Sequence, residues 1–236
     1  MADKSVQLLW GPQTRPSRGP KPAMTLNQIV AAAIAIADAD GLAAVSMQRI
    51  AADLGFTTMS LYRYVPGKNE LLDLMMDTVV GTPPALSEIP GGWRPKLERW
   101  AYLTYEAFHR HPWFLAAATR RRVMGPNEVG WLDQAVAALA GHGLEGDQLI
   151  DAVLTVNGHV SSLAVFTVQE PSAFDEGAMT TFVDLLRQNS VRFPALAAAL
   201  EQGAFQPSPA HPLDFGLQVI LDGIEALTTR GGSPNS

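Results

Sequence analysis

The sequence predicts an all-α protein with a small N-terminal part and a larger C-terminal part. Apolar residues recur at helical spacing through most of the chain, beginning with Leu26, Ile29 and Ala33. No stretch sustains the period-two alternation of a half-buried strand, so no sheet is expected. Helix-ending residues follow the periodic segments, as Gly41 and Pro112 do. With 236 residues, 47% of them hydrophobic, the chain can bury one large or two modest cores.

The N-terminal part, residues 24–70, is predicted to contain three helices. Thr25 is suited to cap the first helix, which Gly41 ends. Ser46 can cap the second, and Gly55 after it can adopt the left-handed conformation that closes a helix. A tight turn then leads into a third, short helix.

The third helix, roughly residues 58–64, turns few side chains inward. Only Leu61 and Val65, four positions apart, form an apolar face, while hydroxyls, aromatic rings and Arg63 occupy the rest. Such a helix fits the recognition helix of a helix-turn-helix, whose side chains reach base edges and phosphates. An ordinary helical hairpin has the same outline, so the pattern alone leaves both interpretations open.

The segment SMQRIAADLGFTTMSLYRYVPGKNELL, residues 46–72, resembles the signature of the TetR family of bacterial transcriptional repressors. The positions that match the family pattern at its spacing are Leu61, Tyr62, Tyr64, Lys68, Leu71 and Leu72. Tyr64 departs from it, because histidine is frequent there. The resemblance implies a homodimer that binds a palindromic operator. The residues expected to contact DNA are Gln48, Thr57, Thr58, Met59, Ser60, Tyr62, Arg63, Tyr64 and Lys68.

These residues are expected to divide into two roles. Thr58, Met59 and Arg63 are the candidate base readers. The resemblance assigns phosphate contacts to Tyr62, Tyr64 and Lys68, and a lysine at a helix start is a flexible point charge suited to a phosphate oxygen.

The charge distribution agrees with one DNA-binding end. Seven Lys or Arg residues against five Asp or Glu residues give residues 1–70 a net charge of +2, whereas ten against eighteen give residues 71–236 a net charge of −8. The acidic part is kept away from the phosphate backbone, and the basic part is left to approach it.

Residues 1–23 are predicted to be a flexible basic arm, and residues 231–236 a disordered tail. The arm is either a plain leader or a segment that reaches phosphates or the minor groove beside the recognition helix. Its basic residues are Lys4, Arg15, Arg18 and Lys21. Its apolar residues fit neither interpretation and are candidates to dock on the protein body: Val6, Leu8, Leu9 and Trp10.

Residues 71–230 are predicted to form a helical domain for ligand binding and dimerisation, entered through a connecting helix from Glu70 to Val80. The further helices expected are Pro95–His111, Trp113 to about Val123, one opened by Gly125-Pro126, Asp147 to about Gln169, and His211 to about Thr229. Between Ser172 and Pro209 the pattern is helical only around 182–186 and 195–200.

The C-terminal domain is expected to bind a small, largely apolar effector. Its candidate contacts are Phe108, Trp113, Phe114, Trp131, Asn157, His159 and Phe166. Aromatic residues at helical spacing are more often core, and a polar pair within an apolar helix needs partners. The tetracycline-binding branch of the family uses a histidine for a magnesium chelate where this chain has Arg120, Arg121 and Arg122, so no metal or other cofactor is expected.

The dimer interface is predicted from two stripes of small and apolar residues. One stripe comprises Gly158 and Ser162, and the other Gly216, Ile220, Gly223 and Leu227. Such stripes let two helices approach closely. The final helix also resembles that of the tetracycline-repressor branch, in which it pairs across a two-fold axis. Packing of both stripes inside one subunit is the alternative.

Two other functions are weaker alternatives. An enzyme is disfavoured because the string Gly141, Gly143, Gly146 follows a helix rather than a strand, and because the chain has neither cysteine nor a G-x-S-x-G string, so no catalytic residue is expected. A DNA-binding regulator without ligand sensing would not need so large a C-terminal domain. Without cysteine, a signal peptide or an apolar run of about 18 residues, a cytoplasmic protein outside the membrane is expected.

Overall fold

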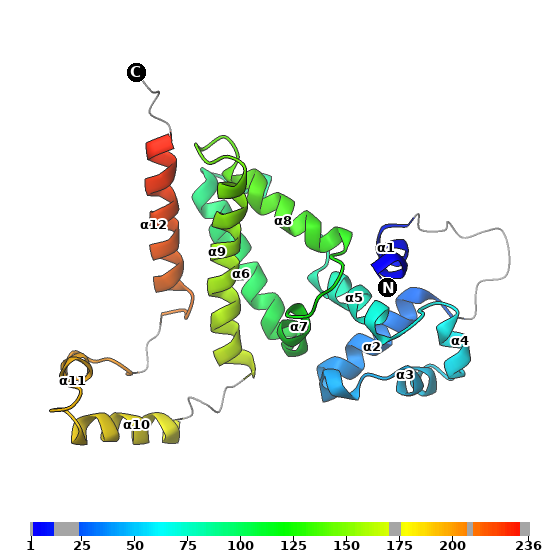
Figure 1. Cartoon of the computed structure of the whole chain (residues 1–236), viewed down its shortest axis with the longest axis horizontal. Coiled ribbons are helices and arrows are strands. Elements are labelled where there is room, and N and C mark those ends of the chain that lie inside the picture. The colour runs from blue at the N-terminus through cyan, green and yellow to red at the C-terminus, as the bar shows by residue number, and fades with distance from the viewer. Residues whose placement is uncertain (1, 12–23, 170–175, 207–209, 232–236) are drawn as a thin grey trace.

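The computed structural model describes residues 2–11, 24–169, 176–206 and 210–231. The described residues form helices and connecting turns, with no strand among them (Figure 1). The α-helices are α1 (Ala2–Trp10), α2 (Leu26–Asp40), α3 (Met47–Asp53), α4 (Thr58–Tyr62), α5 (Lys68–Val80), α6 (Trp93–Arg110), α7 (Pro112–Ala118), α8 (Pro126–Leu139), α9 (Asp147–Ala164), α10 (Glu176–Gln188), α11 (Pro194–Glu201) and α12 (Asp214–Gly231). Shorter helical turns are η1 (Leu42–Ala44), η2 (Leu86–Glu88) and the π-helical η3 (Val165–Gln169).

The predicted helix caps of the N-terminal part are confirmed. The Thr25 hydroxyl accepts the Gln28 backbone N–H, and the Gln28 side chain accepts the Thr25 N–H in return. Ser46 caps α3 in the same way. Gly41 and Gly55 have φ values of 80° and 73°, which side chains other than glycine rarely adopt. Interactions within four residues therefore set these boundaries.

Helices α2, α3 and α4 share one core, and α5 leads from it into the body of the protein (Figure 1). Ile29 from α2, Ile50 from α3 and Leu61 from α4 are fully buried. Helix α5 packs on α2 at its start and on α8 near its end. Helix α5 is buried on several faces because it packs on both parts. A movement of one part is therefore transmitted through α5 to the other.

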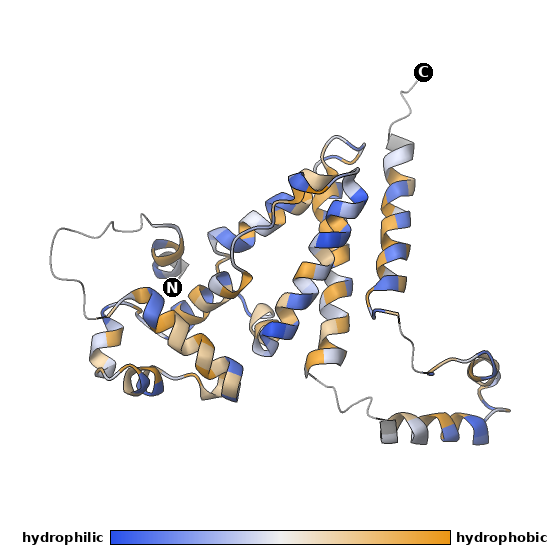
Figure 2. Cartoon of the chain, turned by 180° about the vertical axis from the view of Figure 1, so that it is seen from behind, coloured by the Kyte–Doolittle hydropathy of each residue, from blue (hydrophilic) through white to orange (hydrophobic). Residues whose placement is uncertain are grey.

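The C-terminal body is built around α6 and α9, with α8 packed on both and α12 along α9. Leu97, Leu139, Val156 and Leu217 are fully buried at these contacts. Apolar and polar residues alternate along α12, as expected of a helix with only one face against the body (Figure 2). The body is a layered helical domain.

Helices α10 and α11 form a separate hairpin at one end of the molecule (Figure 1). They pack on each other, and the rings of Phe182 and Phe205 meet edge to face at 5.5 Å between centroids. Phe182 and Leu185 are about half exposed, at 42% and 53%. This segment, where the sequence pattern was weakest, leaves apolar surface uncovered in the single subunit.

The prediction of a flexible arm is wrong for residues 2–10, which form α1 against α5. Leu8 and Leu9 pack on the core, and the Ser5 hydroxyl donates to the Asp73 carboxylate at 2.7 Å. The apolar residues therefore dock, as one of the open interpretations had it. Arg15, Arg18 and Lys21, and the predicted tail beyond residue 231, lie outside the described residues.

The ends of α7 and α9 and the start of α12 differ from the prediction by three residues or more. Helix α7 ends at Ala118 rather than near Val123, because the chain must extend to bring Gly125 against Asp77, where an added Cβ would overlap the carboxylate. Helix α9 ends at Ala164 and continues as a π-helical turn. The last helix begins at Asp214 rather than His211, because the Asp214 carboxylate accepts the His211 backbone N–H.

Candidate DNA-binding surface and effector-binding core

The turn between α3 and α4 sets the orientation of α4. Gly55 allows the chain to reverse, and the Phe56 N–H donates to the Ala51 carbonyl at 2.9 Å. Leu61 and Val65 then anchor α4, since both are fully buried. One face of this short helix is held by the core, and the opposite face is presented to solvent.

The predicted DNA contacts lie mostly on that free face. Met59 is 74% exposed and Tyr62 is 45% exposed, and both exposed fractions are high for such large side chains. Gln48, Thr57, Arg63 and Lys68 are exposed as well, whereas Thr58, Ser60 and Tyr64 are half-buried. The structure brings all nine together on α3, α4 and the start of α5.

Two hydroxyls of the predicted set are already engaged. Thr57 Oγ1 accepts the Ser60 backbone N–H at 3.3 Å and shares a hydrogen bond of 2.9 Å with Ser60 Oγ. Thr57 is therefore the N-cap of α4. These two side chains stiffen α4, and Thr58 and Met59 remain the base-reading candidates among the small and apolar residues.

Sequence reasoning missed Arg49. It is exposed on α3 beside Gln48, and its guanidinium pairs with the Asp40 carboxylate at the end of α2. That pair fixes the guanidinium between α3 and the end of α2. The sequence could have indicated Arg49, because it is a basic residue next to Gln48, a predicted DNA contact on the same helix.

The DNA-binding part meets the body through two carboxylates. Asp38 Oδ1 on α2 accepts the Trp113 indole N–H at 2.6 Å and lies 2.8 Å from His111 Nδ1. Asp77 Oδ1 on α5 accepts the backbone N–H groups of Asn127 and Glu128 at 2.9 and 3.0 Å, capping α8. Burial raises the pKa of the Asp77 carboxyl above its usual value, although these hydrogen bonds act in the opposite direction.

Three of the predicted effector contacts form one aromatic cluster. The Phe108 and Phe114 rings lie 5.3 Å apart between centroids, and Trp113 meets Phe114 edge to face at 6.5 Å. All three are buried. Because Trp113 also bonds to Asp38, the cluster reaches directly to the DNA-binding part.

A neighbouring group of polar aromatic residues was not predicted. The Tyr105 ring contacts the His109 and His211 rings at 4.2 and 5.1 Å, and its hydroxyl donates to Thr167 Oγ1 at 3.1 Å. These side chains come from α6, η3 and the segment before α12. Sequence spacing could not associate them, although a π-helical turn such as η3 is frequent at functional sites.

The remaining predicted effector contacts come from α8, α9 and η3. Trp131 donates its indole N–H to the Gly81 carbonyl at 3.1 Å, a contact between α8 and the end of α5. His159 Nε2 lies 3.4 Å from the Leu213 carbonyl, and Asn157 on the same helix is half-buried. Phe166 is 47% exposed.

The predicted dimer stripe of α12 divides in the structure. An added Cβ on Gly216 would overlap the His159 ring, and Ile220 packs on the core of the same subunit. These two residues therefore contact their own subunit, because α12 needs a small residue to approach α9, and their place in a dimer interface stays a prediction. Gly223 and Leu227, together with Gly158 and Ser162 on α9, are exposed.

An exposed short helix on a glycine turn, joined by a buried connecting helix to a separate helical body, defines a helix-turn-helix DNA-binding regulator. Residues 29–75 match the family described as bacterial regulatory proteins, tetR family, and residues 84–228 match the tetracyclin repressor-like C-terminal domain. The chain belongs to the TetR family, and it is a transcriptional regulator. The matched descriptions are those of regulatory proteins rather than enzymes.

Known proteins agree with this assignment. The chain is 39% identical over 236 residues to the HTH-type transcriptional repressor DrrR1 of Streptomyces coeruleorubidus, covering 96% of this chain and 87% of that repressor. Apo ActR from Streptomyces coelicolor superposes with a TM-score of 0.78 at 25% identity, over 89% of this chain and 99% of ActR. ActR in complex with actinorhodin gives a TM-score of 0.71 at 26% identity, over 86% and 96% of the two chains.

Proposed function

We propose that this protein is a repressor that binds a palindromic operator as a homodimer and is released from it by a small, largely apolar effector. The observation that carries the proposal is the free face of α4, where Met59, Tyr62 and Arg63 are exposed on a helix whose other face is anchored by Leu61 and Val65. A regulator of this kind acts on the chromosome, so we infer a cytoplasmic location.

The exposure of the side chains supports the division into base readers and phosphate contacts. Met59 on α4 and Arg63 at its C-terminal end are both exposed, so they suit the major groove. Tyr64 is half-buried against the core and Lys68 is exposed at the start of α5, so we assign the phosphate contacts to this end of the surface. Gln48 and Arg49 extend the same surface onto α3.

Selection from a random-sequence DNA library with the purified protein tests the operator proposal. We expect an inverted repeat whose half-sites are about one DNA turn, 34–36 Å, or somewhat more apart. Enrichment of a single asymmetric site, or of no sequence, would contradict it.

The exposed apolar surface of α9 and α12 supports the homodimer. Along α9 and the following η3, exposed residues recur every four positions, at Ile150, Leu154, Gly158, Ser162 and Phe166. On α12 they are Phe215, Val219, Gly223 and Leu227, and Phe215 is 84% exposed. Two such faces pack as a four-helix bundle when a second subunit covers them.

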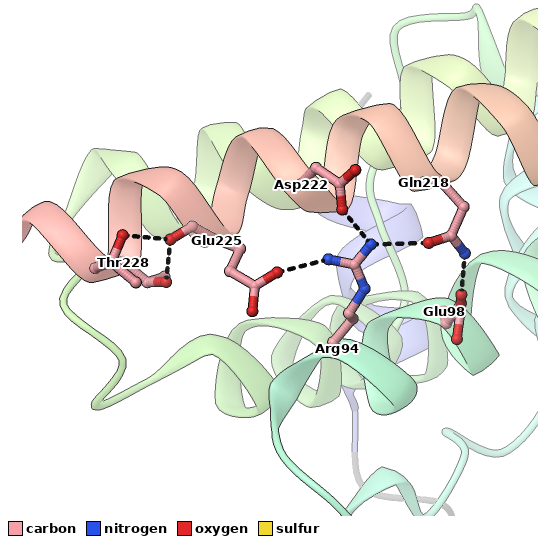
Figure 3. Close-up of polar contacts among 7 residues, drawn as sticks. Arg94, Glu98, Gln218, Asp222, Glu225 and Thr228 are labelled. Carbon is pink, nitrogen blue, oxygen red and sulfur yellow. Dashed lines mark hydrogen bonds and ion pairs between the residues drawn. The ribbon is translucent and has the colours of Figure 1, made fainter.

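Helix α12 is held on the body so that this face points outward. Arg94 on α6 bonds to Asp222 and Glu225 at 2.5 and 2.9 Å and also to Gln218, which in turn bonds to Glu98 (Figure 3). The polar side of α12 is thereby fixed against α6.

One segment of the described chain, Asp147–Val168, is long and apolar enough by length and composition to cross a membrane. This differs from the sequence expectation, which considered only uninterrupted apolar runs. We attribute the exposed apolar residues of this segment to the subunit interface, since they follow one stripe rather than surrounding the helix.

The effector site that we propose lies beside the Phe108 and Phe114 rings, where Tyr105, His109 and Thr167 add polar groups. An apolar wall with a few placed polar groups is the usual lining of a small-molecule site. The complex of the related ActR with actinorhodin supports a small organic effector. Asn157 and His159, which lie on α9, also stay candidate effector contacts.

Release would follow if the effector favours an arrangement in which α4 no longer fits DNA. Trp113 connects the aromatic cluster to Asp38 on α2, so movement of α7 is transmitted to the DNA-binding part. Changing a 1:99 population to 99:1 requires about 5.5 kcal/mol of preferential binding. A regulator that senses no ligand is the second candidate, and retention of operator binding against every fraction of a metabolite extract would favour it.

A further inference from the structure

A polar pocket of about 380 Å³ lies where the first helix, the connecting helix and the body meet. Its walls come from Ser5 on α1, Asn69, Glu70 and Asp73 on α5, and Arg120 and Arg121 on the segment between α7 and α8. It is separate from the aromatic cluster in the body. The three consecutive arginines singled out in the sequence border it, and the proposed function uses none of them.

Asp73 is a buried carboxylate with half of its hydrogen-bonding capacity unused. Only 5% of the residue is exposed. Asp73 Oδ2 accepts the Ser5 hydroxyl at 2.7 Å, whereas Asp73 Oδ1 is buried and has no hydrogen-bond partner. A buried, unsatisfied carboxylate oxygen is costly, so a donor is missing at this position. Glu70, which is also buried at 8% exposure, lies along the same wall and adds a second acid.

Arg120 shows the complementary deficit. Its Nη2 donates to Asn69 Oδ1 at 3.1 Å, but its buried Nη1 has no acceptor. The neighbouring Arg122 differs from Arg120, because both of its terminal nitrogens pair with the Glu128 carboxylate, at 2.7 and 2.5 Å. Arg122 is therefore structural, and Arg120 is left with a free donor at a pocket that also contains an unsatisfied acceptor.

We propose that this pocket binds a small zwitterion, with its ammonium group at Asp73 and Glu70 and its carboxylate or phosphate at Arg120 and Arg121. Such a molecule would supply both the missing donor and the missing acceptor. The volume falls at the lower end of the range of about 300–1,000 Å³ that is usual for small-molecule sites and far exceeds the roughly 30 Å³ share of one water. This inference goes beyond the proposed function, because it concerns a second ligand at another site.

The position of the pocket gives the ligand a physical consequence. Asp73 belongs to the helix that leaves the DNA-binding part, and Arg120 belongs to the body. Helix α1 covers the pocket and is held at its other end by the Trp10 indole N–H, which donates to the Met124 carbonyl at 3.0 Å. A bound zwitterion would connect all three elements and stabilise one relative arrangement of them.

Calorimetric titration of the full-length protein, without DNA, tests the site. The probes are three zwitterions of increasing size, namely γ-aminobutyrate, phosphoethanolamine and glucosamine 6-phosphate. Their matched controls, butyrate, ethanolamine and glucose 6-phosphate, each lack one of the two charges. We expect at least one zwitterion to bind at millimolar concentration or below, and to bind at least about tenfold more tightly than its matched control.

Two substitutions then assign the binding to this pocket. Asp73→Asn and Arg120→Gln should each weaken binding at least about 30-fold, as truncation of one partner of a buried charge pair does. Arg187→Gln, on the distant α10, is the matched control and should leave it unchanged. Thermal melting checks that Asp73→Asn is folded, and the half-buried Arg120 provides a variant with less risk to folding.

Three results would overturn the proposal. Absence of binding by all three zwitterions would mean that water alone fills the pocket. Equal binding of zwitterions and singly charged controls would mean a simple ion site, and unchanged binding in both variants would place the ligand elsewhere. Because the titration contains no DNA, failure of the operator proposal cannot produce any of these results.

Discussion

Asp77 provides a matched pair of substitutions that separates hydrogen bonding from charge at the junction of the two parts. Its Oδ1 accepts two backbone N–H groups at the start of α8, from Asn127 and Glu128. Asp77→Ala removes the acceptor and leaves two donors in a site where only 7% of the residue is exposed. A buried donor without a partner costs about 1–3 kcal/mol, so for two donors we expect a loss of about 2–6 kcal/mol in the free energy of unfolding.

Asp77→Asn has the opposite expectation. The amide oxygen can accept both N–H groups, and the amide carries no charge that must be desolvated. The free energy of unfolding should therefore stay within about 1 kcal/mol of the wild type at neutral pH. Neither variant carries the charge, and the two differ in the hydrogen-bond acceptor and in the volume of the carboxamide group.

The pH dependence follows from the direction of the Asp77 shift. Burial raises the pKa of the folded-state carboxyl above the value of 3.8 that the unfolded chain approximates. The stability that this group contributes is present below the unfolded-state pKa and is lost as pH rises through the folded-state pKa. Asp77→Asn does not titrate, so its stability relative to the wild type should increase with pH over that window.

Urea denaturation followed by circular dichroism, repeated at several pH values from 4 upward, measures both effects. Burial also raises the pKa of Glu128, and the Asp77 charge adds to this, so the titration of Glu128 is common to the two variants but differs from that in the wild type. If Asp77→Ala and Asp77→Asn destabilise equally, or if the difference between Asn and wild type does not change with pH, the role assigned to the carboxylate is incorrect.

The remaining predictions concern DNA, assembly and effector. In gel-shift titrations against a strong and a weak operator, Lys68→Ala should weaken both alike, and a changed ratio would contradict a phosphate contact. Arg63→Ala should cost about 1–3 kcal/mol and relax the preference at one base position. Gly223→Glu should give monomers by light scattering, since it places a charge on the exposed stripe; an unchanged dimer would locate the interface elsewhere. In an anisotropy screen for operator release, inducers that Asn157→Ala and His159→Ala leave unaffected would exclude that pair from the effector site and favour the cluster around α6.

Local patterns predicted much of the fold. Thr25, Ser46 and Gly41 were placed correctly because a helix cap depends on residues within four positions, which the sequence shows directly. The exposed face of α4 could be predicted for the same reason, since two inward residues on so short a helix leave the others outward. The individual contacts with bases and phosphates stay predictions, because their geometry belongs to a complex with DNA.

The residues of the proposed effector site could be predicted only in part from the sequence. Phe108 and Phe114 are six residues apart across a helix break, and their contact was within reach of the sequence. Trp131 is also an aromatic residue at helical spacing, but its indole N–H donates to the Gly81 carbonyl. Tyr105 was not predicted, because its partners Thr167 and His211 lie about sixty and one hundred residues further along the chain. Aromatic content indicates a core and does not indicate which aromatic residues share it.

By itself, the sequence determined the class of the protein, its helical elements and the helix-turn-helix surface, because each rests on short-range backbone geometry and spacing. The tertiary structure alone decided which partner each amphipathic face acquires. Apolar periodicity shows that Gly216 lies on a packing stripe, yet only the approach of α12 to α9 assigns it to His159 of the same subunit. Ser5 and Asp73 are 68 positions apart, and their hydrogen bond exists only because α1 returns to α5. Long-range pairs of this kind depend on how whole helices pack, and no local pattern encodes that choice.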